Sequence, residues 1–518
     1  MLFKKPAIAV CLLIIVFQFN VAAQKAAALP RSVPETEGVS SAGITQFLDA
    51  ESNSKNELHG LVMLRHGKVI VEGYASPYAA ALKHTMYSCS KSFTSTAVGF
   101  AVSENLMSLS DKVVSFFPKD LPDTISPYLS ALTVKDVITM SDGQEPDPSF
   151  TVTSRDTNWA KGFLTTPILH APGSVFLYNS LGTYMLSAIV QKVTGLKVID
   201  YLKPRLFDPL GITGIDWEVD PRGINTGGWG LRLKTADMAK FGQLLLQKGM
   251  WEGIQIVPAE WVKEATTLKI VQHPDWTQEK RDSSDWEQGY CYQYWRCRHN
   301  AFRADGAFGQ YIIVFPELDA VVAITSETKD MQDELNLVWK YLLPAIQKDK
   351  LPADKNAAKM LSNKLAIMAV ALPPKAAASP YAKNISGTNY VFGKNERMIN
   401  AISFTFNNRG CLFTLKTDTA QYKILFGNGS WSKDETTKRG PGLTNAAKAS
   451  FSGLPPAQKI AASYTWLDNH TLALVLRFIE SPHTETYACK FENNKLTVEI
   501  HNSFDPTAKI TVLTGEKK

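Results

Sequence analysis

Residues 86–94 read MYSCSKSFT, and an apolar run that continues through Val102 follows them. Within this stretch Ser88 precedes Lys91 by three positions, and residues three apart on a helix share one face. The serine hydroxyl and the lysine amine would then lie within hydrogen-bond reach. A serine becomes a good nucleophile when a neighbouring base takes its proton, and a partly desolvated lysine can be that base. The stretch predicts a nucleophile and its base, against the alternative of a capping serine and a surface lysine.

The Ser-x-x-Lys spacing is weak evidence when taken alone. The same spacing occurs at Ser52–Lys55, Ser326–Lys329 and Ser430–Lys433. The pair at 88 and 91 differs from these three because an apolar run long enough for a buried helix follows it. A charged lysine in such a helix is costly unless it is paired or neutral. The context therefore favours Ser88 and Lys91 as the functional pair.

The first 23 residues are typical of a secretory signal peptide. Lys4 and Lys5 precede an apolar run over 7–17, and small residues at 21–23 offer a cleavage site near Ala23. We therefore expect a periplasmic or secreted protein. No later segment approaches roughly eighteen uninterrupted apolar residues, so we expect no membrane span. The formal net charge of +6 is small for 518 residues and gives no argument for a nucleic-acid partner.

The cysteines and histidines do not form a recognisable metal-binding pattern. The six cysteines show no zinc-like spacing with histidine, and His-Glu-x-x-His is absent. We therefore predict no metal and no cofactor. A disulfide between Cys411 and Cys489 is possible, whereas Cys291 and Cys297 would lie too far apart on an extended strand.

Strand patterns at both ends of a long helical region predict an α+β domain over 31–350. Residues 61–75 read as a hairpin with its turn at His66-Gly67, and residues 288–296 and 310–325 again read as strands. Helical patterns fill most of 92–247. We expect an antiparallel sheet built from distant segments, flanked by helices and accompanied by an all-helical subdomain.

The character of the sequence changes after a helix and a Pro/Ala-rich linker over 351–380. Beyond the linker, apolar residues alternate with polar ones, most clearly in Thr471–Phe478. Several short strands with turn residues between them predict a separate all-β domain over 381–518, either a barrel or a sandwich.

Five ordered landmarks resemble those of the serine β-lactamase and penicillin-binding-protein superfamily, with the class C β-lactamase-like esterases and peptidases the nearest branch. The resemblance covers about 34–348. The landmarks are SCSK at 88–91, LTVKDVITMSDG at 132–143, PGSVFLYNS at 172–180, WGLRLKTAD at 229–237 and ADGAFGQ at 304–310. The resemblance implies a β-lactamase-like fold.

The resemblance also implies a role for each matching residue. Ser88 would attack the acyl carbonyl, Lys91 would take or relay its proton, and Tyr178 would pass the proton to the leaving group. The backbone N–H groups of Ser88 and Ala307 would bind the developing oxyanion. Gly306 would let the substrate lie close to the strand.

Two positions depart from the family pattern. The family often has Asn at the third place of the second motif, where it touches the lysine and the substrate amide. This chain has Ser180 there and Asn179 one residue earlier, and both are candidate substrate-binding residues. If the segment is extended, Asn179 would point to the face opposite Ser180. The third motif usually starts with Lys or His, which helps to hold a substrate carboxylate, and here it starts with Ala304. Arg303 or Arg232 could compensate, although we expect both to be solvated surface charges.

The leading hypothesis is an exported serine hydrolase that cleaves a small-molecule ester, amide or peptide through a covalent acyl-serine. One alternative is a catalytically inactive relative that binds cell-wall fragments or another ligand. Another is a true β-lactamase or D-alanyl carboxypeptidase. The nucleophile elbow Gly-x-Ser-x-Gly of the α/β-hydrolase fold is absent.

Overall fold

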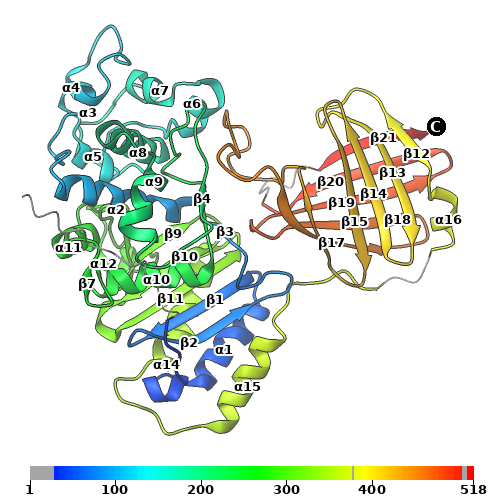
Figure 1. The fold of residues 1–518 in the computed structure, drawn as a ribbon, viewed down its shortest axis with the longest axis horizontal. Helices are drawn as coiled ribbons and strands as arrows, with labels where there is room; N and C mark the ends of the chain where they lie inside the picture. Colours follow the sequence, from blue (N-terminus) through cyan, green and yellow to red (C-terminus); the bar gives the residue numbers. More distant parts are fainter. Residues whose placement is uncertain (1–28, 376–378, 505–509) are drawn as a thin grey trace, which may run out of the picture.

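The computed structural model describes residues 29–375, 379–504 and 510–518. The predicted signal peptide, 1–23, lies outside the described residues. Figure 1 shows a mixed α/β part beside a C-terminal barrel. No helix within the described ranges is both long and apolar enough to cross a bilayer.

The central sheet of the α/β part has six antiparallel strands in the order β2-β1-β11-β10-β9-β8. The N-terminal hairpin pairs through β1 with β11, more than 240 residues later in the chain, as the sequence predicted. The hairpin turns at His66 and Gly67, both with positive φ. The strands are β1 (Glu57–Arg65), β2 (Lys68–Tyr74), β8 (Trp295–Arg296), β9 (Phe302–Gly306), β10 (Gln310–Phe315) and β11 (Ala320–Glu327).

Alternate residues of β1 face two different apolar cores, because successive side chains of a strand point to opposite faces. Leu61 and Met63 pack with the terminal helices, and Val62 and Leu64 pack with α2 and α10. The terminal helices are α1 (Ser41–Ser52), α13 (Met331–Leu337), the π-helical turn η5 (Val338–Leu342), α14 (Leu343–Ala345) and α15 (Lys355–Ala366). On the other face lie α2 (Ser90–Ser103) and α10 (Thr235–Leu246).

A helical subdomain stands at the far end of α2, as Figure 1 shows. Its central helix α8 packs against α2, α5 and α7. The subdomain contains α3 (Val113–Phe116), α4 (Pro127–Ala131), α5 (Val134–Ile138), α6 (Ser149–Arg155), α7 (Trp159–Thr165), α8 (Ser180–Thr194), α9 (Val198–Leu202) and the π-helical turn η3 (Lys203–Phe207).

Short elements connect these layers. They are η1 (Pro34–Glu37), β3 (His84–Thr85), η2 (Tyr87–Cys89), β4 (Asp216–Trp217), β5 (Leu231–Leu233), β6 (Met250–Trp251), β7 (Ile254–Gln255), α11 (Ala259–Thr266), α12 (Gln278–Arg281) and η4 (Pro316–Leu318). The predicted strand over 288–296 was too long, since only its last two residues form β8.

The C-terminal part is a closed barrel, which decides between the barrel and the sandwich that the sequence left open. Nine strands run in the order β15-β14-β13-β12-β21-β20-β19-β18-β17, and a parallel pairing of β15 with β17 closes the ring. The apolar face predicted for β18 points into the barrel core, because Leu472, Leu474, Leu476 and Phe478 are all buried there.

The barrel elements follow α16 (Tyr381–Ile385). They are β12 (Asn389–Phe392), β13 (Ile399–Asn407), β14 (Gly410–Thr417), β15 (Gln421–Asn428), β16 (Ser432–Thr436), β17 (Gln458–Trp466), β18 (Thr471–Phe478), β19 (Thr484–Glu492), β20 (Lys495–Asn502) and β21 (Thr511–Lys517). Strand β16 pairs with the first half of β17, residues 458–462, and β15 pairs with residues 463 and 464 of the same strand. The loop 437–457 extends from the barrel toward α6 (Figure 1), where the Lys448 N–H donates to the Thr153 carbonyl at 2.7 Å.

The cysteines of the described ranges are free thiols. Cys411 and Cys489, the possible disulfide partners, are both fully buried in the barrel core without being joined.

Candidate active site

Ser88 lies in the short 3-10 turn η2, directly before α2 begins at Ser90. The Ser90 hydroxyl donates to the Tyr87 carbonyl at 2.6 Å and accepts from the Leu231 N–H at 3.2 Å. Tyr87 itself has a φ of 44°, in the left-handed region that bulky residues rarely occupy. A held, strained turn therefore presents Ser88 at the start of a buried helix.

The Lys91 amine is surrounded by three oxygen atoms. Its Nζ lies 3.0 Å from the Ser88 hydroxyl, 3.0 Å from the Ser180 hydroxyl and 2.8 Å from the Gly228 carbonyl. Only 2% of the residue is exposed. Burial lowers the pKa of Lys91 to about 7, against the opposing effect of the nearby acidic side chains. Near neutral pH a substantial share of the amine is therefore unprotonated and able to accept a proton.

Tyr178 also packs against the Lys91 amine. Its ring centroid is 4.8 Å from Lys91 Nζ, and the ring stacks on Trp295 at 5.7 Å. Burial raises the pKa of the Tyr178 hydroxyl, the charge of Asp305 acts in the same direction, and hydrogen bonding to Ser88 opposes both. The phenol is therefore protonated over the physiological range and can donate.

Of the two polar residues that follow Tyr178 in the second family motif, Ser180 lies in the site and Asn179 lies outside it. Ser180 contacts Lys91, as given above. Asn179 is fully buried and caps α8: its Oδ1 accepts from the Gly182 N–H at 3.0 Å, and its Nδ2 donates to Gln144 at 3.1 Å. This placement does not fit the expectation that Asn179 contacts substrate. The preference of helix N-caps for Asn is the sequence signal for this role.

Gly306 ends β9 directly against the nucleophile turn. A Cβ built on Gly306 would lie 3.1 Å from the Ser88 nitrogen and 3.2 Å from the Cys89 nitrogen. It would also overlap the Met86 carbonyl oxygen, well inside the ordinary contact distance of 3.4 Å. Glycine is therefore needed here for close approach. Gly306 therefore lies beside the Ser88 N–H, and Ala307 is the next residue along the chain.

Hydrogen bonds from the Gln310 side chain hold the turn that follows β9. The Gln310 side-chain amide donates to the carbonyls of Ala307 and Phe308, both at 3.2 Å, and to the Ser326 carbonyl at 2.8 Å. Phe308 has a φ of 67°. Because its carbonyls are held, the turn keeps the Ala307 amide in a fixed place. Sequence reasoning did not identify Gln310.

The expectation that Arg303 and Arg232 are solvated surface charges was wrong. Arg303 is fully buried, pairs with Asp305 at 2.8 Å and donates to the Asp285 carbonyl at 2.9 Å. Arg232 is 3% exposed and pairs with Asp216 at 2.6 Å and with Glu480 at 3.2 Å. Neither guanidinium is free to hold a substrate carboxylate.

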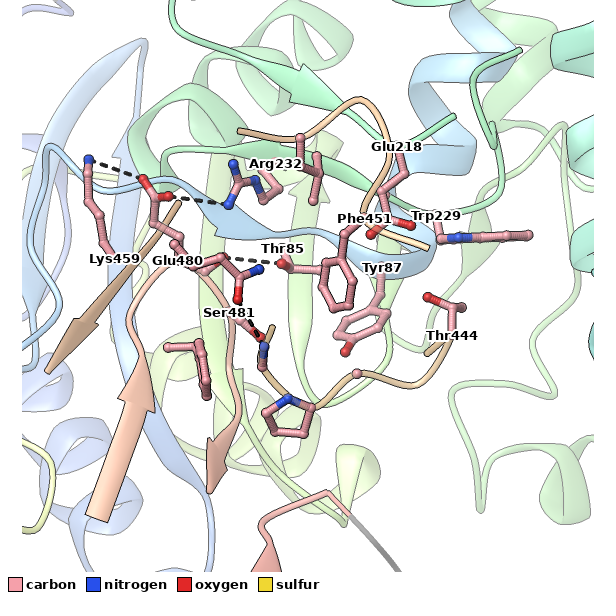
Figure 2. Close-up of a pocket in the computed structure, with 17 residues that line it drawn as sticks. Thr85, Tyr87, Glu218, Trp229, Arg232, Thr444, Phe451, Lys459, Glu480 and Ser481 are labelled. Carbon is pink, nitrogen blue, oxygen red and sulfur yellow. Dashed lines mark hydrogen bonds and ion pairs between the residues drawn. The ribbon is translucent and has the colours of Figure 1, made fainter. Parts of the chain in front are cut away.

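A small cavity lies behind Tyr87, between the α/β part and the barrel. Figure 2 shows Tyr87, Thr85 and Glu218 around Phe451 of the loop 437–457, whereas the Trp229 ring points away from them. The cavity volume of about 30 Å³ suits one or two water-sized molecules and not a substrate. Burial raises the pKa of Glu218 to about 7. The cavity is therefore a small void next to Tyr87, at the interface between the α/β part and the barrel.

No group of three or more His, Cys, Asp or Glu side chains within the described ranges is placed to hold a metal ion. Cys89, next to the nucleophile, donates its thiol to the Gln310 carbonyl at 3.1 Å, and burial raises its pKa well above the ordinary value. The Cys89 thiol is therefore unreactive as a nucleophile.

Several known proteins resemble this chain in sequence. The 6-aminohexanoate-dimer hydrolase of Paenarthrobacter ureafaciens is 28% identical over 289 residues, which is 52% of this chain and 72% of that protein. The mitochondrial serine beta-lactamase-like protein LACTB of Bos taurus is 28% identical over 204 residues, 30% of this chain and only 36% of that protein.

Among solved structures, a putative 6-aminohexanoate-dimer hydrolase from Bacillus anthracis superposes with a TM-score of 0.52 at 21% identity. The match covers 64% of this chain and 90% of that one, and it shows a shared fold. The family model described as Beta-lactamase matches residues 54–344, more than half of the chain. The chain therefore belongs to the Beta-lactamase family, within the superfamily of serine β-lactamases and penicillin-binding proteins.

Proposed function

We propose that the protein is an exported serine hydrolase that cleaves an ester or a small amide through a covalent acyl intermediate on Ser88. The observation that carries this proposal is the buried Lys91 amine, which contacts the Ser88 hydroxyl at 3.0 Å and has its pKa lowered to about 7 by burial. Acyl transfer at neutral pH requires a nucleophile and, at hydrogen-bond distance from it, a base whose pKa lies near the working pH.

In the acylation step, Ser88 Oγ forms a bond to the substrate carbonyl carbon while its proton passes to neutral Lys91. The carbonyl oxygen becomes an oxyanion that accepts from the N–H groups of Ser88 and Ala307. Removing one such donor typically lowers kcat by about 10²–10³. The oxyanion then re-forms the carbonyl, and the bond from its carbon to the leaving oxygen or nitrogen breaks. The leaving alcohol or amine takes the Tyr178 proton, and Tyr178 regains one from Lys91. Water attacks the acyl group in the reverse sequence and restores Ser88.

The site favours substrates that carry no carboxylate next to the scissile bond. Ala304 replaces the family cation of the third motif, and both nearby arginines are buried in ion pairs. This supports an ester or amide hydrolase over a β-lactamase or D-alanyl carboxypeptidase. The name of the 28% identical relative, 6-aminohexanoate-dimer hydrolase, supports a small linear amide as one substrate class.

A fluorophosphonate probe tests the proposal, because it reacts with an activated serine. We expect stoichiometric labelling of the wild-type protein that is lost in Ser88→Ala. Ser52→Ala is the matched control, since Ser52 has the same spacing to a lysine but lies at the end of α1 and bonds the Leu48 carbonyl. A folded wild-type protein that remains unlabelled would instead favour the inactive binding relative. Nitrocefin turnover at an enzyme-like rate would favour a true β-lactamase.

A further inference from the structure

We propose that His483, supplied by the C-terminal barrel, is a positioning residue that holds together the two backbone segments carrying the oxyanion donors. This inference rests on the proposed acyl-transfer function and deepens it, because it makes the barrel a part of the catalytic unit. The geometry that carries it involves the residues next to the two donors, Tyr87 and Phe308.

The two donor residues each have a strained neighbour. Tyr87, directly before Ser88, has a φ of 44°, and Phe308, directly after Ala307, has a φ of 67°. Aromatic residues seldom adopt a left-handed backbone, and they keep it only when the surroundings over-determine it. The direction of both donor N–H groups therefore depends on whatever holds these two rings in place.

His483 contacts both rings. Its Nε2 hydrogen-bonds the Tyr87 hydroxyl, and its ring meets Phe308 edge-on at 4.7 Å between centroids. The Tyr87 and Phe308 rings also meet each other, at 5.4 Å. His483 is fully buried, although it follows Ser88 by nearly 400 residues. The imidazole therefore fills the junction between the nucleophile turn and the turn after β9.

The orientation of the imidazole is itself fixed. His483 Nδ1 lies 2.7 Å from Glu327 Oε1, which also accepts from the Ser503 hydroxyl at 2.6 Å. A carboxylate only accepts, so we assign the hydrogen to Nδ1, and Nε2 then accepts from the phenol. Burial raises the pKa of Tyr87, which keeps this phenol a donor.

Glu327 links the same chain of contacts back to the oxyanion turn. It ends β11, and the N–H of the next residue, Thr328, donates to the Phe308 carbonyl at 3.1 Å. Tyr87, His483 and Glu327 thus form a hydrogen-bonded series. It reaches Phe308 twice, through the ring contact of His483 and through the backbone hydrogen bond of Thr328, which follows Glu327. Loosening this series would misdirect the donors without altering any group that contacts the substrate.

This role predicts a loss in kcat with little change in KM, because the donors act on the transition state. Misplacement of groups at an active site by about 1 Å can cost 10²-fold in rate. We therefore expect His483→Ala to lower kcat for p-nitrophenyl butyrate by about 10–100-fold. The rate of fluorophosphonate labelling at Ser88 should fall in parallel, since the phosphonyl oxygen enters the same site.

Two companion variants separate positioning from general structure. His483→Gln keeps an acceptor near the Tyr87 hydroxyl and should recover part of the lost kcat. Tyr87→Phe removes only the hydroxyl, and it should lower kcat in the wild-type background but have little further effect in His483→Ala. If His483→Ala does not fold, Tyr87→Phe alone must show the selective loss in kcat.

Arg477→Lys is the control for docking of the barrel. The Arg477 guanidinium donates two hydrogen bonds to the Glu57 carboxylate across the same interface, one of them at 2.8 Å. Neither bond involves Tyr87 or Phe308. Lysine keeps the charge but cannot form the fork-like pair. We expect this variant to lower Tm while keeping kcat within about threefold of wild type.

The outcomes are distinct. Kinetics of His483→Ala within threefold of wild type, a rise in KM alone, or an equal loss of kcat in Arg477→Lys would each overturn the inference while leaving the hydrolase intact. A wild-type protein that neither labels at Ser88 nor turns over an ester or amide overturns the hydrolase proposal and this inference with it.

Discussion

Substitution of Gly306 by alanine tests the contact between β9 and the nucleophile turn. The new Cβ would overlap the Met86 carbonyl oxygen and lie 3.1 Å from the Ser88 nitrogen. These neighbours are backbone atoms in a turn that is already strained at Tyr87, so no side chain can swing aside. To restore ordinary contact, β9 and η2 must separate by roughly 1 Å, a shift of the size that costs about 10²-fold in enzyme rates.

We therefore expect Gly306→Ala to lower kcat by about 100-fold or more. Overpacking of this kind also destabilises a protein by typically about 1–3 kcal/mol, so the variant should remain folded at 25 °C. Hydrolysis of p-nitrophenyl butyrate gives the kinetics, and thermal unfolding by circular dichroism gives the stability.

Gly393→Ala provides a matched control within the barrel. A Cβ at Gly393 meets nothing within 4 Å, so this variant should leave both Tm and kcat unchanged. A Gly306→Ala protein whose kcat lies within threefold of wild type would refute the reasoning, because the oxyanion donors would then tolerate separation of the two elements.

Three further predictions follow from buried polar groups. The base form of Lys91 is the neutral amine and its pKa is about 7, so kcat/KM should rise with pH through about 7 and then level; a profile that is flat from pH 5 to 9 contradicts this. Burial raises the pKa of Glu51, so the folded chain retains a proton that the unfolded chain releases above its ordinary pKa of about 4.3, and stability falls as pH rises above that value. Glu51→Gln should therefore raise the free energy of unfolding in urea at pH 8 and change it little at pH 4. Asn179→Ala should cost about 1 kcal/mol of stability as a lost helix cap, whereas Ser180→Ala, which removes a partner of Lys91, should lower kcat more than Tm.

Local patterns made much of the fold and part of the site predictable. Ser88 and Lys91 lie together because they are three positions apart at the start of a helix, and this spacing is a property of the chain itself. The turn at His66-Gly67 and the alternation in β18 are likewise local. Such features depend on neighbours in sequence, so a single sequence carries their signal.

The placement of Asn179 shows how a local assumption failed. In an extended segment, residues 179 and 180 would point to opposite faces. Helix α8 instead begins at Ser180, and the need to cap its first turn takes up the Asn179 side chain. The sequence contains both the family motif and the preference of helix N-caps for Asn. The Asn179 side chain serves as the cap because it satisfies an otherwise unpaired N–H at the start of α8.

The ion pair of Arg232 with Glu480 and the position of His483 depend on distant segments. Arg232 meets Glu480 from the barrel, and His483 meets Tyr87 from the α/β part. Nothing near either residue in sequence indicates these partners, because each partner lies in the other part of the fold. Arg303 differs, since its partner Asp305 is only two residues away. Gln310 was missed for a different reason: its bonds are to backbone carbonyls, which any sequence offers.

The central claim is that Ser88 forms a covalent acyl bond during turnover. Rapid acid quenching of the wild-type protein with an ester substrate, followed by trypsin digestion and mass spectrometry, tests it most directly. We predict an added acyl mass on the peptide 84–91, which ends at Lys91 and contains Ser88, with fragment ions assigning it to Ser88 rather than Cys89 or Ser90. Turnover without that acyl mass, or with the same mass retained in Ser88→Ala, would contradict the account.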